Sequence, residues 1–301
     1  MTEEKIKTEK INVLISTLMF ANLTGSEMYT FELAKKLKEL NCDVTVLSNI
    51  GEPMVSMAKN LGIKTVSIKS PQQLSGVKFD IIHTQHLPVS EFVCGSFPNT
   101  PKLSVIHSEI ISLENPYIHP SIKKYIAIRP EIQDHIVKNF NIDISKTEVI
   151  YNPVDPKKFN TIDTKDDGYI LFVGTIDYLR KNSIFDLVEY SKSLNKELWL
   201  VGVNHGNYLN QLLSNPHVKH FDATIDVEKY VKNCSETAGI LLGRTTIEGW
   251  MCGKPGWIYN IDGSGNIISK SKNEVPYDID KFNSEKVALK IKEEYLKIIT
   301  Q

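Results

Sequence analysis

The chain has 301 residues, and its 35 basic residues (Lys and Arg) against 36 acidic ones leave a formal net charge of −1 at pH 7. This length allows two domains of about 150 residues each, and the balanced charge gives no electrostatic support for a dedicated nucleic-acid binder. The four cysteines are scattered, without a Cys-x-x-Cys pair or the histidine spacing of a zinc site, which favours reduced thiols and predicts no metal site.

No apolar run approaches the length of a membrane span, and the first ten residues are polar and charged. This pattern predicts no signal peptide and no stable membrane insertion. We therefore expect a cytoplasmic protein that associates with a membrane at most peripherally.

The first half of the chain alternates short apolar runs with amphipathic segments after a tail, residues 1–10, that we expect to be solvated. Strands are predicted at 11–17, 43–47, 65–68, 79–83, 103–106, 125–128 and 148–151. Helices are predicted at 26–41, 53–61 and 130–140, where apolar residues recur every three or four positions. Such alternation is typical of a doubly wound parallel sheet, which binds ligands at the carboxyl ends of its strands.

A break follows at Asn152-Pro-Val-Asp-Pro156 and the polar residues up to Gly168, which we interpret as an interdomain linker. Further strands are then predicted at 169–173, 198–201, 218–221, 240–242 and 257–259, with helices near 181–194, 208–213, 227–231 and 285–299. The sequence therefore predicts an α/β protein of two Rossmann-like domains, residues 1–155 and 156–301, facing one another across a cleft. The helix at 285–299 is expected to close the second domain.

The strongest indication of a ligand site lies after the apolar run 240–242. This run ends in Gly243, Thr245 and Thr246 are placed to cap a short helix, and Gly253 stops that helix. The N-terminus of a helix attracts anions because its free N–H groups and the positive end of its dipole point outward together.

Two charged residues accompany this helix start. Arg244 suits a diphosphate, and Glu248, one turn further on, suits a pair of hydroxyl groups. The alternative is a plain i, i+4 ion pair on the surface, which is common and weak.

The segment Glu248-Gly-Trp-Met-Cys-Gly-Lys-Pro255 resembles the Glu-Ala-Met-Ala-Cys-Gly-Lys-Pro segment of GT-B glycosyltransferases, family 4 in particular. The resemblance extends over roughly residues 11–263. It implies the GT-B fold and a glutamate, Glu248, that binds the ribose hydroxyls of a nucleotide-sugar donor. The family carries a second glutamate eight positions earlier that touches the sugar. This chain has Ile240 there, so we expect its sugar recognition to differ.

Three further segments extend the resemblance in the first half. Thr24-Gly-Ser-Glu27 is similar to the family's Gly-Gly-Ala-Glu opening and implies that Gly25 approaches the donor, with a simple turn glycine as the alternative. Asp80-Ile-Ile-His-Thr-Gln-His86 resembles Asp-Val-Val-His-x-His and implies that His83 and His86 line the cleft near the acceptor. The alternatives are hydrogen-bonded loop histidines, or a metal pair that lacks a third ligand.

Val105-Ile-His-Ser-Glu109 places His107 just past a strand end and matches the family's Val-His-Asp. The resemblance implies that His107 touches the transferred sugar, with Glu109 as a neighbouring carboxylate on the acceptor side. A loop histidine without a functional role is the alternative.

Gly174-Thr-Ile-Asp-Tyr-Leu-Arg-Lys181 follows a strand and opens a helix. Two cations at a helix N-terminus face the positive end of the dipole, an arrangement that favours a bound anion over the alternative of solvated charge. In the family this loop holds the donor diphosphate with a Gly-Arg pair and a lysine. Gly174 and Lys181 match that pattern, and Arg180 or Arg244 is expected to supply the guanidinium group.

The sequence thus predicts a glycosyltransferase that moves a sugar from a UDP- or GDP-linked donor to an unidentified acceptor, such as a glycan, a lipid or a small molecule. The resemblance implies retention of anomeric configuration without metal or cofactor. His107, Lys181 and Arg244 are the expected catalytic residues. Two alternatives stay open: an epimerase of the same fold that uses His107 and Glu109, and a non-catalytic nucleotide-sugar-binding protein, which the missing glutamate favours.

Overall fold

The computed structural model describes residues 2–300 and divides them into two compact units. The first unit is made of the N-terminal segment up to Asn22, of Ser26–Pro153 and of the C-terminal helix from Ser284 on. The second unit is made of Leu23–Gly25 and Val154–Asn283. The chain therefore passes from one unit to the other at Pro153, whereas we expected the boundary after residue 155.

The first unit is built on a seven-stranded sheet of order β3-β2-β1-β4-β5-β6-β7 whose neighbours all run parallel. Its strands are β1 (Ile11–Phe20), β2 (Cys42–Ile50), β3 (Lys64–Ser67), β4 (Ile81–Gln85), β5 (Lys102–Ile106), β6 (Ile122–Ala127) and β7 (Thr147–Val149). Every residue of β4 and β5 is buried, as expected of central strands that are covered on both faces.

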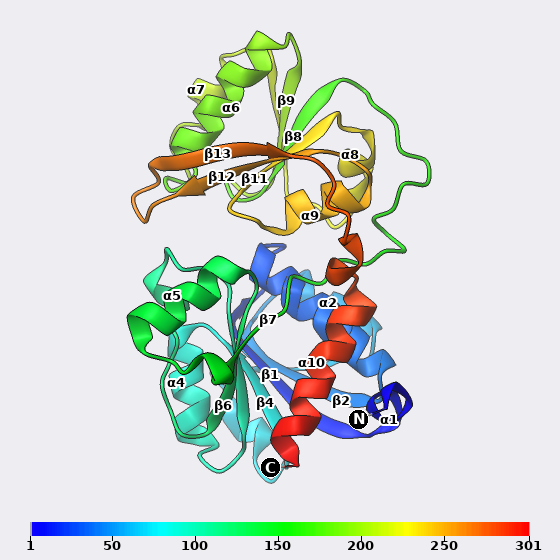
Figure 1. Cartoon of the computed structure of the whole chain (residues 1–301), viewed down its shortest axis with the longest axis vertical. Coiled ribbons are helices and arrows are strands. Elements are labelled where there is room, and N and C mark those ends of the chain that lie inside the picture. The colour runs from blue at the N-terminus through cyan, green and yellow to red at the C-terminus, as the bar shows by residue number, and fades with distance from the viewer. Residues whose placement is uncertain (1, 301) are drawn as a thin grey trace. The chain divides into compact units, whose positions relative to one another are not determined.

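Helices cover both faces of this sheet, with α4 and α5 on one side and α2 and α10 on the other (Figure 1). The helices are α1 (Glu3–Thr8), α2 (Gly25–Glu39), α3 (Met54–Asn60), α4 (Leu87–Ser96), α5 (Pro130–Phe140) and α10 (Ser284–Ile299). The expectation of a solvated tail at residues 1–10 is wrong, because α1 forms there and buries Ile6. Helix α4 was not predicted, although Val89 and Val93 pack into the core of the sheet.

The C-terminal helix α10 belongs to the first unit, and its assignment to the second domain is corrected. Its apolar face was recognised, but an amphipathic pattern does not say which sheet the helix covers. Tyr295 reaches His83 on β4, and the fully buried Lys292 ammonium donates to the Glu9 carbonyl at 2.6 Å and also to those of Lys7 and Leu40. Tyr295 thus packs α10 against β4, and Lys292 holds the helix against the N-terminal segment and the end of α2.

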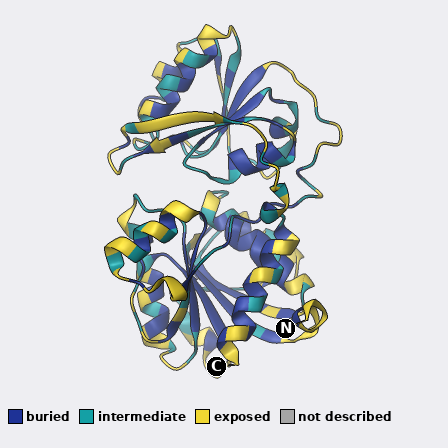
Figure 2. Ribbon diagram, in the orientation of Figure 1, coloured by how far each residue is buried: buried dark blue, intermediate teal, exposed yellow. Residues whose placement is uncertain are grey.

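The second unit has a six-stranded sheet of order β10-β9-β8-β11-β12-β13. Its strands are β8 (Tyr169–Val173), β9 (Glu197–Val201), β10 (Val218–Phe221), β11 (Glu236–Ile240), β12 (Gly256–Ile261) and β13 (Ile267–Asn273). All neighbours are parallel except β13, which returns antiparallel to β12. Strand β13 was not predicted, because it is polar and largely exposed along its length (Figure 2).

The helices of the second unit are α6 (Lys181–Ser193), α7 (Leu209–Leu213), α8 (Glu228–Asn233) and α9 (Arg244–Met251). Helix α9 packs unusually close to its sheet. A Cβ atom on Gly249 would lie 2.5 Å from Thr237 Oγ1, and one on Gly239 would lie 2.6 Å from Thr246 Oγ1. The small residues thus set the distance between α9 and the sheet.

The two sheets confirm the prediction of two parallel-sheet α/β domains.

Candidate functional site

In the second unit, the predicted donor residues gather where strands β8 and β11 end. Arg244 opens α9, and its guanidinium donates to Glu248 Oε1 at 2.8 Å; the two side chains are only 11% and 5% exposed. The pair is therefore largely shielded from solvent, and the alternative of a surface ion pair does not describe it. A buried ion pair holds both partners in one geometry, because separating them leaves a charge without compensation.

The two threonines do not cap the helix as expected. The N-cap residue is Gly243, and both threonines lie within the first turn. Thr245 donates from Oγ1 to the Val173 carbonyl at 2.8 Å, which ties the start of α9 to the end of β8. Thr246 is fully buried beneath the helix, and its Oγ1 has no hydrogen-bond partner among the described residues. Because Thr246 faces the sheet, the structure does not support its donor-binding role.

Gly174 directly follows β8 and lies against the end of β9. Its N–H donates to the Val201 carbonyl at 3.0 Å, and a Cβ on Gly202 would collide with its carbonyl oxygen. Gly202 has a φ of +152°, which glycine adopts readily and other residues rarely do. The two glycines let the backbones meet at this edge of the sheet.

The structure distinguishes among the three predicted cations. Arg180 is the N-cap residue of α6; its N–H donates to Asp177 Oδ1 at 3.0 Å and its guanidinium also pairs with that carboxylate. Arg244 is paired with Glu248. Lys181 lies 5.7 Å from the centre of the Tyr208 ring, and no carboxylate among residues 2–300 pairs with it. Lys181 is thus the cation best able to meet an incoming anion.

Gly25 begins α2, and a Cβ atom placed there would meet nothing within 4 Å. Internal packing therefore does not require a glycine at this position. The space beside it is compatible with the predicted approach of a ligand.

In the first unit, His107 follows β5 and is held on two sides. Its backbone N–H donates to Glu114 Oε2 at 3.2 Å, and its Nε2 lies 2.7 Å from Gln85 Oε1. The edge of the imidazole meets the Tyr29 ring at a centroid distance of 4.8 Å. Burial lowers the pKa of His107 to about 4, with His86 and Arg129 adding to the effect and Glu114 opposing it. The ring is therefore neutral at pH 7.

Hydrogen-bond donors and acceptors along α2 determine the tautomer of His107. The Thr30 hydroxyl donates to the Ser26 carbonyl at 2.9 Å, so it accepts from the Gln85 amide nitrogen, also at 2.9 Å. Gln85 then presents its carbonyl oxygen to His107, which must carry its proton on Nε2. Within residues 2–300 no group hydrogen-bonds to Nδ1, so this lone pair is left for a ligand.

His86 supports this cluster from the end of β4. Its Nδ1 accepts the Leu18 N–H at 3.3 Å, so its Nε2 donates to Glu114 Oε1 at 3.2 Å. His86 has a φ of +66°, a conformation that costs a non-glycine residue about 1 kcal/mol or more. Burial raises the pKa of Glu114. The hydrogen bond from His86, electrostatic interactions with both histidine rings and the bond from the His107 backbone N–H lower it, and the net shift is downward. His86 thus acts through Glu114 on the His107 backbone.

Glu109 pairs with Arg129, a buried residue that the sequence interpretation did not single out. Arg129 lies two residues past the end of β6 and directly follows the strand predicted at 125–128. His107 was predicted as a site residue from the same kind of position after β5, so this signal could have found Arg129. Glu114 lies in a short 3₁₀ helix, Ser112–Glu114, and no sequence pattern indicated it.

His83 is not a cleft residue, and that prediction is corrected. It is fully buried within β4, and its Nδ1 lies 2.6 Å from the Tyr295 hydroxyl. Its Nε2 has no hydrogen-bond partner within the part of the chain that the structure describes. Side chains alternate along a strand, so His83 faces α10 in the core while His86, beyond the end of the strand, turns to the site.

Across residues 2–300, no group of three or more His, Cys, Asp or Glu side chains could hold a metal ion. In the same part of the chain, no helix combines the length and apolar character needed to cross a bilayer.

Residues 23–158 match the model of Glycosyltransferase Family 4. No curated protein sequence matches the chain. Three solved structures are similar over nearly its whole length. The Anabaena protein HepE, in complex with UDP-glucose, is 14% identical, covers 96% of this chain and 99% of its own, and gives a TM-score of 0.68.

AviGT4, a glycosyltransferase involved in avilamycin A biosynthesis, is 13% identical, with coverage of 96% and 98% and a TM-score of 0.68. The UDP-GlcNAc 2-epimerase of Methanocaldococcus jannaschii is 12% identical, with coverage of 97% and 93% and a TM-score of 0.57. At these identities the structural likeness establishes the fold alone. The chain has the GT-B fold, and its residues 23–158 are similar to Glycosyltransferase Family 4.

Proposed function

We propose that the chain transfers a sugar from a nucleoside-diphosphate sugar, UDP- or GDP-linked, to an acceptor, and that its second unit holds the nucleotide. The observation that carries this proposal is the set of charges at the carboxyl edge of the second sheet. There the largely buried Arg244–Glu248 pair stands at the start of one helix. Lys181, which has no carboxylate partner among residues 2–300, stands at the start of another. A fixed carboxylate suits ribose hydroxyls, and a cation without a carboxylate partner suits a diphosphate.

Glu248 keeps acceptor capacity beyond its bond to Arg244. A carboxylate offers about four lone-pair sites on two oxygens, and Arg244 occupies one of them on Oε1. In the proposed complex the remaining sites accept hydrogen bonds from the two ribose hydroxyls. Arg244 fixes the direction of the carboxylate and thereby orients the nucleoside.

Lys181 carries the main electrostatic role. As the bond between the sugar and the diphosphate breaks, negative charge grows on the leaving group, and a cation already in place stabilises it without reorganisation. Arg180 is committed to Asp177, so we assign it to shaping the loop that presents Lys181. Retention of configuration and independence from metal ions are part of the proposal and rest on the family resemblance.

His107 supplies a neutral polar group from the first unit. Its Nε2 is engaged by Gln85, so Nδ1 accepts a hydrogen bond from a sugar hydroxyl. The lowered pKa keeps this acceptor unprotonated throughout the physiological range.

The test begins with calorimetry of UDP and GDP binding to the wild-type chain and to Glu248→Gln and Lys181→Met variants. Glu248→Gln keeps an oxygen for Arg244 but loses the charged acceptor, so nucleotide affinity should fall by about tenfold. Lys181→Met should cost on the order of a hundredfold in kcat, the scale for one lost transition-state donor. Wild-type chain that binds neither nucleotide would contradict the proposal.

An epimerase is the second candidate, because the epimerase from Methanocaldococcus jannaschii shares the fold. Its acid and base would be His107 and Glu109, yet Glu109 is paired with Arg129 and His107 is neutral. Incubation with UDP-sugars alone separates the two functions, since an epimerase produces a new UDP-sugar without an acceptor. A non-catalytic binding protein would bind the nucleotide sugar and leave it intact with every acceptor offered.

A further inference from the structure

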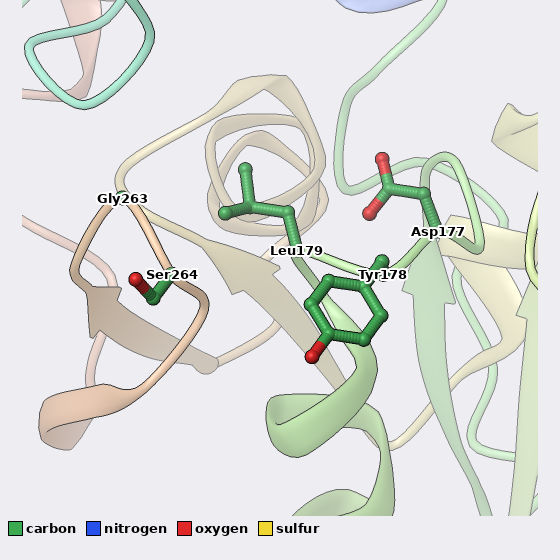
Figure 3. A pocket seen from close by; sticks show the side chains of 5 residues that line it. All are labelled: Asp177, Tyr178, Leu179, Gly263 and Ser264. Carbon is green, nitrogen blue, oxygen red and sulfur yellow. The ribbon is translucent and has the colours of Figure 1, made fainter.

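We propose, on the basis of the function proposed above, that a pocket at the edge of the second sheet binds the pyranose ring of a sugar. The pocket has a volume of about 620 Å³ and is lined by Asp177, Tyr178, Leu179, Gly263 and Ser264 (Figure 3). The first three residues follow β8, and the last two form the turn between β12 and β13. Because β8 and β12 run parallel within one sheet, both segments lie at its carboxyl edge, where such sheets bind ligands.

One wall of the pocket is a turn organised by Asp262. Its Oδ1 accepts the N–H groups of Ser264 at 2.8 Å and Asn266 at 2.9 Å, and its Oδ2 accepts the Asn266 side-chain amide at 2.9 Å. These bonds lower the pKa of the Asp262 carboxyl group. The turn is therefore held in one conformation, with the Ser264 hydroxyl as its polar contribution to the pocket.

The turn between β12 and β13 also contacts the segment after β8, which forms the opposite wall of the pocket. Asn182 on α6 donates its side-chain amide to the Gly265 carbonyl at 3.0 Å. A Cβ on Gly265, whose φ is +80°, would lie 2.5 Å from the Leu179 carbonyl oxygen, so a glycine lets the two segments touch. On the other side, the Tyr208 hydroxyl donates to the Asp177 carbonyl at 2.7 Å. The pocket is thus formed before any ligand arrives.

The lining matches the chemistry of a pyranose, which has an apolar C–H face and a rim of hydroxyls. Tyr178 is 77% exposed, so its ring is open for packing against C–H groups. In Figure 3, Tyr178 and Leu179 lie between Ser264 and Asp177. Arg180 occupies one site on each Asp177 oxygen, which leaves further lone pairs for sugar hydroxyls.

Two neighbouring features favour this pocket as the place where a sugar binds: the end of β11 offers no polar side chain at Ile240, and the pocket lies beside Lys181. Ile240, at the end of β11, is apolar and packs against the core of the second unit, so it offers no hydrogen bond to a hydroxyl. The pocket residues 177–179 directly precede Arg180 and Lys181 in the chain, which brings the pocket close to the proposed diphosphate position. The sugar is either that of the donor or that of a saccharide acceptor, and both present the same chemistry.

The experiment uses the full chain with Tyr178→Ala and Ser264→Ala, and with Tyr277→Ala as the matched control. Tyr277 is fully exposed and does not line the pocket, so its loss reports the effect of removing a surface tyrosine. Calorimetry measures affinity for UDP, GDP, UDP-glucose, UDP-galactose and GDP-mannose. Ligand-observed NMR measures binding of the methyl glycosides of glucose, galactose, mannose and N-acetylglucosamine.

If the pocket holds the donor sugar, Tyr178→Ala weakens binding of the preferred nucleotide sugar about tenfold and leaves that of the bare nucleotide unchanged, with a smaller loss for Ser264→Ala. If it holds the acceptor, the methyl-glycoside signals disappear in Tyr178→Ala and nucleotide-sugar affinity is unchanged. Tyr178→Ala that matches Tyr277→Ala in both measurements overturns the inference. Wild-type chain without affinity for any nucleotide refutes the proposed function instead, and the methyl-glycoside measurement still decides on the pocket.

Discussion

Acid conditions are expected to destabilise the first unit through His83. This imidazole is fully buried and is hydrogen-bonded at Nδ1 to the Tyr295 hydroxyl, and no group of residues 2–300 hydrogen-bonds to its Nε2. Burial lowers its pKa from 6.5 to about 3, and the nearby His107 adds to that shift. The folded chain therefore keeps the ring neutral, whereas the unfolded chain protonates it below pH 6.5.

The sign and size of the effect follow from proton linkage. Between pH 6.5 and about 3 the unfolded chain binds more protons at His83, so the free energy of unfolding falls as the pH falls through this window. Lowering the pH from 7 to 5 should remove about 2 kcal/mol at this site. His107, whose pKa is lowered to about 4, should remove a further ~2 kcal/mol over the same interval.

Urea unfolding at pH 7 and at pH 5 measures this loss. His83→Asn places a non-titrating amide near the Nδ1 position, so its loss between the two pH values should be about 2 kcal/mol smaller than that of the wild type. Tyr295→Phe removes the hydrogen bond but leaves the imidazole buried, and should keep the wild-type pH dependence. Equal losses for His83→Asn and the wild type would refute the reasoning, because another group would then bind the proton.

Three further predictions follow from the site geometry. Gln85→Leu removes the acceptor for His107 Nε2–H and should lower kcat by about tenfold at unchanged nucleotide affinity, whereas Gln85→Glu keeps an acceptor and should retain more activity; steady-state rates decide. Glu248→Ala removes the carboxylate from the largely buried Arg244 and should cost about 3 kcal/mol in unfolding free energy, clearly more than Glu248→Gln, as thermal unfolding can show. Gly202→Ala should lower the Tm by several degrees, since its Cβ would collide with a neighbouring carbonyl; an unchanged Tm would mean that the loop relaxes at no cost.

Local patterns were sufficient for most strands and helices of the chain. The predicted strand at 169–173 and the predicted helix at 130–140 coincide with β8 and α5. Each combines an apolar periodicity with a terminal signal, such as Pro130 at the first helical position, and these depend on neighbouring residues alone. Strand β13 escaped prediction because its serines and lysines lie at an exposed edge, where no apolar pattern is required.

The positions of site residues were predictable in part, since the end of a parallel strand is a favoured ligand position. This rule placed Gly174, His107 and Arg244, and it would also have placed Arg129. It failed for His83, which lies inside a strand rather than after it, because only the alternation of side chains across the sheet turns that ring toward α10.

Composition and short-range periodicity by themselves determined two parallel α/β domains and the loops that carry the polar residues. Only the tertiary structure decided which charges are paired: Arg180 with Asp177, Arg244 with Glu248, and Lys181 with no carboxylate among the described residues. It also decided that α10 covers the first sheet, far in sequence from the strands it buries. The physical reason is the same in both cases, because ion pairing and burial depend on distances between segments that the chain brings together only on folding.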